Sequence, residues 1–440
     1  MPKMPNPVIV LPGIIATYLR DDYPLPPESI WEVLEGSKQY ERAALHPDNL
    51  RFEAVEPARV VPGQLYEVAY KELIEELRHN LRQRSDQPVP VYPYAYDWRQ
   101  PLTASCEGLG AFIDEVIGRT LLLRHYDADD SYKADPRVDL VGHSMGGLVI
   151  AGYLASAGSH HRVGSVVTLA TPFQGSYEAV IKVTTGTANL GVSPPSSRER
   201  EAARATPALY HLLPSFPGAL TVPAGSGLPS DLFDPAVWQP SVVDTLKQYI
   251  QLRGLTPANA RTQAEALFAA MLGNAKKFRV LTDGLDLKKC NLTQDDWLCV
   301  VGIGSTTRVQ LSVAVTGGKP NFAFDGSDRK NEWGKPAPAN PEMTGDGTVP
   351  FRGALPKFLP REKLVCVTPD DFGYWEVQDK LTAAVAGFHG ILPNMDMIHR
   401  LIVAFLTDRK DKHGNIWGHR APGVSAAAWD PPQAGLDDKT

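Results

Sequence analysis

The feature that most constrains this chain is a Gly-x-Ser-x-Gly pattern set between an apolar strand and an apolar helix. Residues 138–142 form the strand candidate, Ser144 follows almost at once, and residues 148–157 form the helix candidate. Gly142 and Gly146 stand where a Cβ would crowd a sharp strand-to-helix turn. Such a turn exposes the serine hydroxyl, and the helix start places free N–H groups beside it. These letters also arise by chance in a glycine-rich chain, but the flanking elements favour Ser144 as a nucleophile.

A serine nucleophile needs a base, and the order of the histidines narrows the choice. In the α/β-hydrolase order an acid and then a histidine follow the serine. His389 lies in a Gly-Phe-His-Gly loop after the last strand candidate, whereas His399 lies inside the helix candidate that follows. The other downstream histidines lie near the end of the nucleophile helix, in an inserted segment or near the C-terminus: His160, His161, His211, His413 and His419. We predict His389 as the base, with His399 as the alternative.

The acid that orients this base is predicted to be Asp346, in the turn Gly-Asp-Gly-Thr-Val-Pro. Asp346 lies between Ser144 and His389 in the order that the chemistry requires. An Asp-Gly turn without any catalytic role is the ordinary alternative. Other acidic residues of the region remain rivals: Asp325, Asp328, Glu342, Asp370 and Asp371.

An oxyanion hole combines the N–H of the residue after the nucleophile with one from a loop after an early strand. The first of these is Met145. The turn Pro12-Gly13-Ile14 follows a buried strand candidate, so we predict the N–H of Ile14 as the second donor.

Short apolar runs without alternation recur along the chain, as expected for strands that are covered on both faces of a parallel sheet. They are residues 8–11, 89–94, 138–142, 165–170, 298–303 and 364–368. Amphipathic segments predict helices at 67–82, 107–123, 148–157, 242–252, 259–272 and 394–406. The first of these helices places one apolar face at Val68, Leu73, Ile74, Leu77 and Leu81. The alternation predicts an α/β class: an α/β-hydrolase fold with a mostly parallel sheet, helices on both faces and an inserted lid or cap.

Two long segments interrupt this alternation. We predict one α/β-hydrolase domain over residues 1–410, with a cap on the membrane side at 19–66, a lid at 177–277, and a polar tail at 411–440. Four apolar lid residues fit an acyl groove or an ordinary core equally well: Leu209, Leu212, Leu213 and Phe216. Trp31 and Leu34 could touch a lipid interface, although packing is the more ordinary explanation.

The composition limits which partners and cofactors the chain is expected to bind. The 44 Lys and Arg against 50 Asp and Glu give a net charge of -6, without the basic excess of a nucleic-acid binder. The cysteines are too few for a disulfide scaffold and match no zinc spacing: Cys106, Cys290, Cys299 and Cys366. Cys290 and Cys299 are near enough in sequence to pair, but buried thiols are the simpler expectation. We expect no metal, no cofactor and no nucleic-acid partner, and the sequence indicates no oligomeric state.

The N-terminal residues lack the pattern of a secretory signal peptide. They hold one lysine and a short apolar run that Pro12 and Gly13 interrupt. We therefore expect a cytoplasmic protein and leave export by a signal-independent route open.

Together the motifs resemble the lecithin:cholesterol acyltransferase family of α/β-hydrolases, which includes group XV phospholipase A2 and the phospholipid:diacylglycerol acyltransferases. The resemblance rests on nine segments in order: 7–19, 60–80, PYAYDWRQ at 93–100, GHSMGG at 142–147, LATPFQGS at 169–176, RATPALYHLLPS at 204–215, VVGIGSTTR at 300–308, GDGTVP at 345–350 and HGILPN at 389–394. The chain departs from the secreted members because residues 19–66 hold no cysteine, so a disulfide-closed membrane loop has no counterpart.

The resemblance implies a triad of Ser144, Asp346 and His389 with an oxyanion hole at Ile14 and Met145. It also implies acyl-ester substrates, phospholipids foremost, and leaves peripheral membrane contact open. The leading hypothesis is a serine hydrolase acting on lipid or other acyl esters. An O-acyltransferase that passes the acyl group to an alcohol is the first alternative. A non-catalytic lipid-binding protein that keeps the fold is the second.

Overall fold

A parallel sheet forms the centre of the molecule. The computed structural model describes residues 4–23, 26–32, 43–45, 60–186, 197–254, 256–323, 333–334, 340–374, 376, 379, 387–410 and 414–439. Six strands pair in the order β14-β9-β7-β6-β1-β5, and every pairing is parallel. They are β1 (Val8–Leu11), β5 (Val91–Pro93), β6 (Val138–His143), β7 (Val163–Leu169), β9 (Trp297–Gly302) and β14 (Leu364–Val367). This arrangement confirms the predicted α/β-hydrolase fold.

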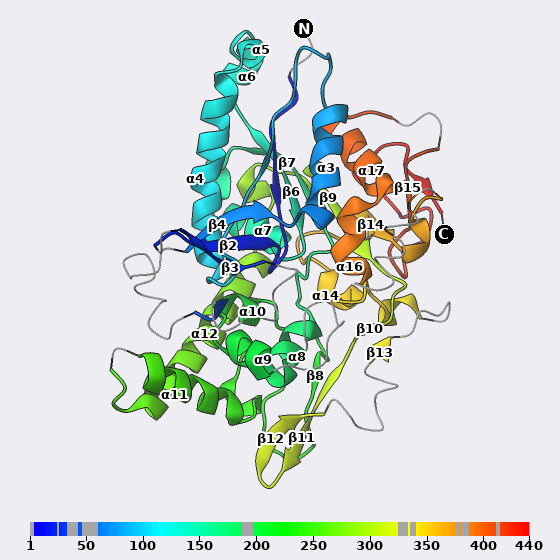
Figure 1. The fold of residues 1–440 in the computed structure, drawn as a ribbon. Coiled ribbons are helices and arrows are strands. Elements are labelled where there is room, and N and C mark those ends of the chain that lie inside the picture. The colour runs from blue at the N-terminus through cyan, green and yellow to red at the C-terminus, as the bar shows by residue number, and fades with distance from the viewer. Residues whose placement is uncertain are drawn as a thin grey trace.

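Helices cover both faces of the sheet (Figure 1). One face holds α3 (Glu67–Asn80) and α17 (Asp396–Thr407), and the other holds α4 (Leu102–Leu121) and α7 (Met145–Ala157). Successive side chains of a strand point to opposite faces. In β1, Val8 and Val10 therefore join the core under α3 and α17, while Ile9 and Leu11 join the core under α4 and α7. Burial on both faces explains why these strands are continuously apolar in sequence.

The predicted strands agree with the observed ones to within two residues at each end. The helices agree less well at their ends, because α4 begins at Leu102 and α12 (Ala260–Asp283) continues well past residue 272. The predicted apolar face of α3 is wrong at Val68, which is 48% exposed. Instead α3 buries Ala69 and Tyr70 together with Leu73 and Leu77.

The segment between the first strand and α3 forms a small antiparallel sheet beside the central one. Its strands are β2 (Thr17–Asp21), β3 (Glu28–Trp31) and β4 (Val60–Leu65), in the order β3-β2-β4. Trp31 is fully buried: its indole N–H donates to the carbonyl of Ile15 at 2.8 Å, and its ring meets Trp98 edge-on. Trp31 thus packs inside the protein, while Leu34 lies outside the described residues.

The segment predicted to be the lid contributes mostly helices, which lie largely beyond the carboxyl ends of the central strands in Figure 1, while the last of them, α12, also packs against α7. They are α8 (Tyr177–Thr185), α9 (Ser197–Arg204), α10 (Pro207–His211), α11 (Ser241–Arg253) and α12. Its short strand β8 (Leu220–Thr221) pairs with β11 (Leu311–Thr316), which forms a hairpin with β12 (Lys319–Phe322). A later part of the chain therefore joins this layer. The four apolar residues that could line a groove are all buried: Leu209, Leu212, Leu213 and Phe216.

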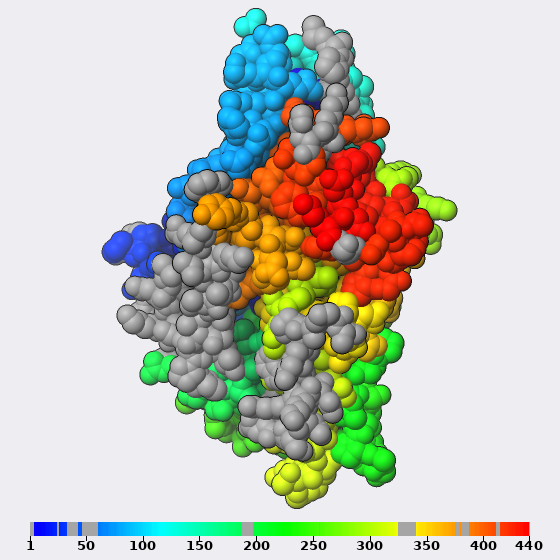
Figure 2. Space-filling model, turned by 90° about the vertical axis from the view of Figure 1, so that its right-hand side faces the viewer, coloured from blue at the N-terminus to red at the C-terminus, as the bar shows by residue number. Residues whose placement is uncertain are grey.

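The remaining short elements lie around the sheet. They are α5 (Arg124–Asp127), α6 (Asp130–Ala134), β10 (Thr307–Arg308), β13 (Trp333–Gly334), α14 (Phe351–Ala354), α16 (Phe388–Ile391), β15 (Trp417–Gly418) and β16 (Asp437–Asp438). The C-terminal segment, red in Figure 2, lies against the orange residues before it. There His419 and Cys366 exchange backbone hydrogen bonds at the edge of the sheet. All four cysteines carry free, buried thiols. None of the helices in the described part of the chain combines the length and the apolar character that a membrane span requires.

Candidate active site

Ser144 occupies a strained turn between β6 and α7. Its backbone angles, φ of 54° and ψ of -126°, lie in a region that residues other than glycine rarely adopt. The two glycines of the motif make this turn possible. A Cβ on Gly142 would lie 2.7 Å from the Cδ1 of Ile150, and one on Gly146 would lie 2.6 Å from the carbonyl oxygen of Leu11. Both positions therefore require a residue without a Cβ, and the resulting turn holds Ser144 at the end of β6.

Ser144, His389 and Asp346 form one hydrogen-bonded chain. The Nε2 of His389 lies 2.9 Å from the Oγ of Ser144, and its Nδ1 lies 2.7 Å from the Oδ2 of Asp346. An ionised carboxylate only accepts hydrogen bonds, so Nδ1 carries the proton in the neutral imidazole. Nε2 then has a free lone pair, and the Ser144 hydroxyl donates to it. This is the arrangement that lets a histidine remove the hydroxyl proton of a serine.

Main-chain groups hold Asp346 in place. Its Oδ1 accepts hydrogen bonds from the amides of Thr348 at 2.9 Å and Val349 at 2.7 Å. Its carbonyl accepts the amide of His389 at 3.1 Å, so the base and the acid are also tied through the backbone. A Cβ on Gly302 would lie 2.5 Å from the Cβ of Asp346, which places the aspartate directly over the end of β9. Asp346 is 1% exposed.

The rival residues lie elsewhere. His399 is buried in α17, where its Nε2 bonds to the carbonyl of Pro393. Glu342 pairs with Arg361, and Asp371 pairs with His419. Of the other histidines, His160 is exposed just after α7, and His161 bonds to the carbonyl of Cys290. His211 is buried in the lid segment, and Asp370 lies in the same turn as Asp371. Asp325, Asp328 and His413 lie outside the described residues.

The two predicted oxyanion donors belong to segments that meet at Ser144. Met145 is the first residue of α7, so its amide is one of the first-turn N–H groups that have no partner within the helix. Gly13 lies against the serine, because a Cβ on it would stand 3.0 Å from the Cβ of Ser144. Ile14 follows Gly13 directly. The role of Ile14 and Met145 as oxyanion donors stays a prediction.

The sequence pattern did not single out two residues that contact this site, His143 and Tyr70. The Nε2 of His143 lies 2.9 Å from the carbonyl oxygen of His389, and its Nδ1 lies 2.7 Å from the hydroxyl of Tyr70. Burial, together with the charge of His389 when protonated, holds the pKa of His143 well below its usual range, so this imidazole is neutral. The available signals were the position of His143 next to the nucleophile and that of Tyr70 on the buried face of α3.

The fold defines the class of protein. A chain of the crystal structure of the Tle4–Tli4 complex superposes with a TM-score of 0.59 at 16% identity, over 92% of this chain and 98% of that chain. At this identity the likeness shows the α/β-hydrolase fold alone. None of the curated proteins matches the sequence closely enough to count as a relative.

A family match narrows the class. Residues 52–227 match the family described as lecithin:cholesterol acyltransferase, which confirms the resemblance that the motifs indicated. The matched range contains Ser144, whereas Asp346 and His389 lie beyond it. This match supports an enzyme of lipid acyl-ester chemistry, either a hydrolase or an acyltransferase.

Proposed function

We propose that this protein is a serine hydrolase that cleaves acyl esters of lipids through an acyl-enzyme on Ser144. The observation that carries the proposal is the hydrogen-bonded chain from the Ser144 hydroxyl through His389 to the Asp346 carboxylate, with heavy-atom distances of 2.9 and 2.7 Å. The match to the lecithin:cholesterol acyltransferase family supports lipid esters as the substrate class.

The proposed reaction has two halves. In the first, Nε2 of His389 takes the proton of Ser144 while Oγ attacks the ester carbonyl carbon. The amides of Ile14 and Met145 stabilise the negative charge that develops on the carbonyl oxygen. His389 then gives its proton to the leaving alcohol, and the acyl group remains on Ser144.

In the second half, water attacks the acyl-enzyme. His389 removes a proton from this water, a second tetrahedral intermediate forms, and the proton returns to Oγ of Ser144 as the carboxylic acid leaves. Asp346 stays ionised throughout, because its task is to hold the imidazole in the correct tautomer and to stabilise its protonated form.

The test of this function uses the purified full chain with phosphatidylcholine vesicles and with p-nitrophenyl esters of increasing acyl length. We expect fatty acid and p-nitrophenol release by the wild type and loss of both with Ser144→Ala. Equal turnover by Ser144→Ala would contradict the proposal. The acyl-length series and the vesicles, each with and without detergent, distinguish a lipid substrate from a smaller ester.

The family match also favours a second candidate, an O-acyltransferase. Both reactions pass through the same acyl-enzyme, and only the nucleophile that resolves it differs. Adding an alcohol acceptor such as a sterol or a diacylglycerol to the vesicle assay separates the two. In a transferase the acceptor hydroxyl attacks the acyl-enzyme and an ester of the acceptor forms in place of free fatty acid, whereas a hydrolase continues to release free fatty acid.

A further inference from the structure

Two buried tyrosine hydroxyls hold the peptide group that joins Pro12 to Gly13. The carbonyl oxygen of Pro12 accepts a hydrogen bond from the hydroxyl of Tyr96 at 2.7 Å. The amide of Gly13, at the other side of the same peptide plane, donates to the hydroxyl oxygen of Tyr70 at 2.8 Å. Tyr70 comes from α3 and Tyr96 from the loop after β5, and the two side chains are 1% and 3% exposed.

The hydrogen bonds around Tyr70 have one consistent direction. The carbonyl of His389 only accepts, so Nε2 of His143 carries the proton and donates to it. Nδ1 of the neutral His143 is then an acceptor, and the hydroxyl of Tyr70 donates to it. The oxygen of Tyr70 in turn accepts the amide of Gly13. Hydrogen bonds therefore run without interruption from the loop at Gly13 to the main chain of the predicted base.

The backbone freedom of Gly13 is the reason why the Pro12–Gly13 peptide has to be fixed by its neighbours. A residue with a Cβ at this position would crowd Ser144, since that atom would lie 3.0 Å from the Cβ of the serine. Glycine, however, has the widest backbone freedom of any residue, and here it precedes the amide of Ile14. A rotation of the peptide plane before Gly13 would carry the next amide away from the oxygen that it has to stabilise. Fixing both the carbonyl and the amide of that plane opposes this rotation.

We propose that Tyr70 and Tyr96 are positioning residues that clamp the Pro12–Gly13 peptide and so aim the Ile14 amide at the developing oxyanion. This inference rests on the proposed function of Ser144 and deepens it. Neither hydroxyl touches the substrate. Their effect is on the geometry of the transition state, where displacement by a fraction of an ångström is costly to the rate.

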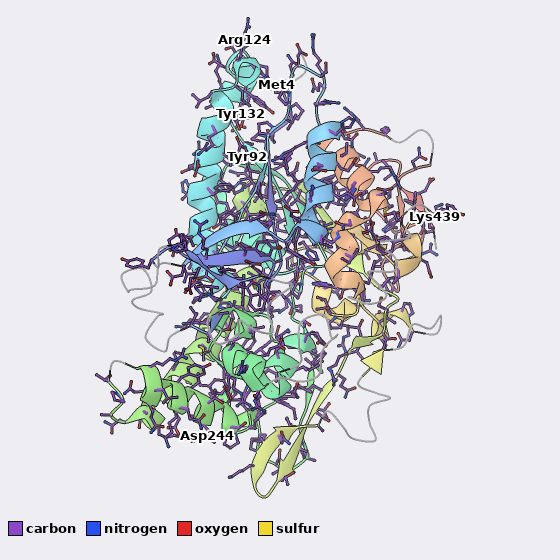
Figure 3. The ribbon with its side chains drawn as sticks, viewed as in Figure 1. Met4, Tyr92, Arg124, Tyr132, Asp244 and Lys439 are labelled. Atoms are coloured by element: carbon purple, nitrogen blue, oxygen red, sulfur yellow. The ribbon has the colours of Figure 1, made fainter. Side chains whose placement is uncertain are left out.

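The test removes single oxygen atoms. Tyr70→Phe and Tyr96→Phe keep both rings and remove the two bonds that hold the peptide from its opposite sides. Tyr70→Phe also removes the bond to Nδ1 of His143. Tyr132→Phe is the matched control, because Tyr132 is also fully buried and its hydroxyl also donates to a main-chain carbonyl, that of Arg137. Tyr132 lies before the start of β6, near Met4 and far from the lid residue Asp244 in Figure 3, whereas Ser144 follows the end of that strand.

Three quantities are measured for each variant: kcat and KM for a p-nitrophenyl ester, and the inhibition constant of an alkyl boronic acid, which forms a tetrahedral adduct with the serine. We expect kcat to fall by about tenfold or more in both clamp variants, with KM within twofold of the wild type. The inhibition constant of the boronic acid should rise by the same factor as kcat/KM falls, because the bound inhibitor resembles the tetrahedral intermediate. The thermal midpoint of each variant reports whether it is folded, and the Tyr132 variant should keep all three kinetic constants.

A rise in KM with unchanged kcat would overturn the inference, as would clamp variants that lose no more activity than Tyr132→Phe. Ser144→Ala is assayed in parallel. If it is inactive while the clamp variants behave like the control, only the clamp is wrong. If it keeps full activity, the proposed function itself is wrong. Should one clamp variant fail to fold, the other tests the same peptide from its opposite atom.

Discussion

Gly13 lies so close to Ser144 that a Cβ on the glycine would stand 3.0 Å from the Cβ of the serine and 3.4 Å from its hydroxyl oxygen. The loop after the first strand and the turn after β6 are thus in direct contact, although about 130 residues separate them in sequence. The contact joins the predicted nucleophile to the segment that carries the predicted oxyanion donor. Any change that moves one should move the other.

The first prediction concerns this contact. Gly13→Ala forces either Ser144 or the loop to shift by several tenths of an ångström, so we expect kcat/KM for a p-nitrophenyl ester to fall by about tenfold or more. Gly118→Ala is the control, because a Cβ at that helical position meets nothing within 4 Å. The control should keep full activity and the same or a higher thermal midpoint. Equal activities of the two variants would show that the contact has no functional consequence.

The second prediction concerns the acid. In Asp346→Asn the Oδ1 atom still accepts the amides of Thr348 and Val349, so the turn should keep its structure. The amide group that replaces Oδ2 donates rather than accepts, which favours the wrong tautomer of His389. We expect kcat to fall by about 10³–10⁴-fold with little change in the thermal midpoint. A variant that retained most of its activity would remove Asp346 from the mechanism.

The third prediction concerns a buried ion pair. Arg99 is 1% exposed and meets both carboxylate oxygens of Asp97, at 2.8 and 2.7 Å. Arg99→Leu leaves the carboxylate of Asp97 without this partner, so we expect the free energy of unfolding to fall by about 3–5 kcal/mol. Arg119→Leu removes an exposed pair with Glu115 and should cost less than about 1 kcal/mol. Urea denaturation of both variants measures the difference, and equal losses would contradict the assignment.

The fourth prediction concerns pH. Burial, and secondarily the charge of Arg279, lowers the pKa of His211 to about 3. Between this value and its ordinary pKa of 6.5 the unfolded chain binds a proton that the folded protein does not, so His211 makes stability fall as the pH falls. His211→Leu removes this effect. Between about pH 6 and pH 4 we therefore expect the free energy of unfolding of the variant to fall by about 1.4 kcal/mol less per pH unit than that of the wild type. Parallel stability curves for the wild type and the variant would mean that His211 is protonated in the folded state.

Local patterns in the sequence were sufficient to predict the central sheet and the strand-to-helix turn at Ser144. Strands buried on both faces require continuous apolar runs, and the turn at Ser144 requires glycine at two fixed positions. Each feature can therefore be recognised within a few consecutive residues of the sequence. His389 and Asp346 could be predicted only by their order along the chain, and the structure brings both to Ser144.

Other features depend on contacts between distant segments, for which a single sequence carries no signal. The hydroxyls of Tyr70 and Tyr96 bond to main-chain atoms of the Pro12–Gly13 peptide, and any residue type offers such atoms. The pairing of β8 with β11 joins residues about 90 positions apart through two residue pairs, because β8 is only two residues long. The burial of Tyr70 in place of Val68 shows that an apolar pattern identifies a helix more reliably than the residues that it buries.

The measurement that tests the central claim most directly is covalent labelling. A fluorophosphonate reacts with a serine only where a base activates the hydroxyl and an oxyanion hole accepts the phosphoryl oxygen. Mass spectrometry of the digested, labelled protein should find one phosphonyl group, on the peptide that contains Ser144. No label should appear with Ser144→Ala, and labelling should be much slower with His389→Gln. A label on another residue, or a folded protein that takes up none, would contradict the claim that Ser144 is the nucleophile.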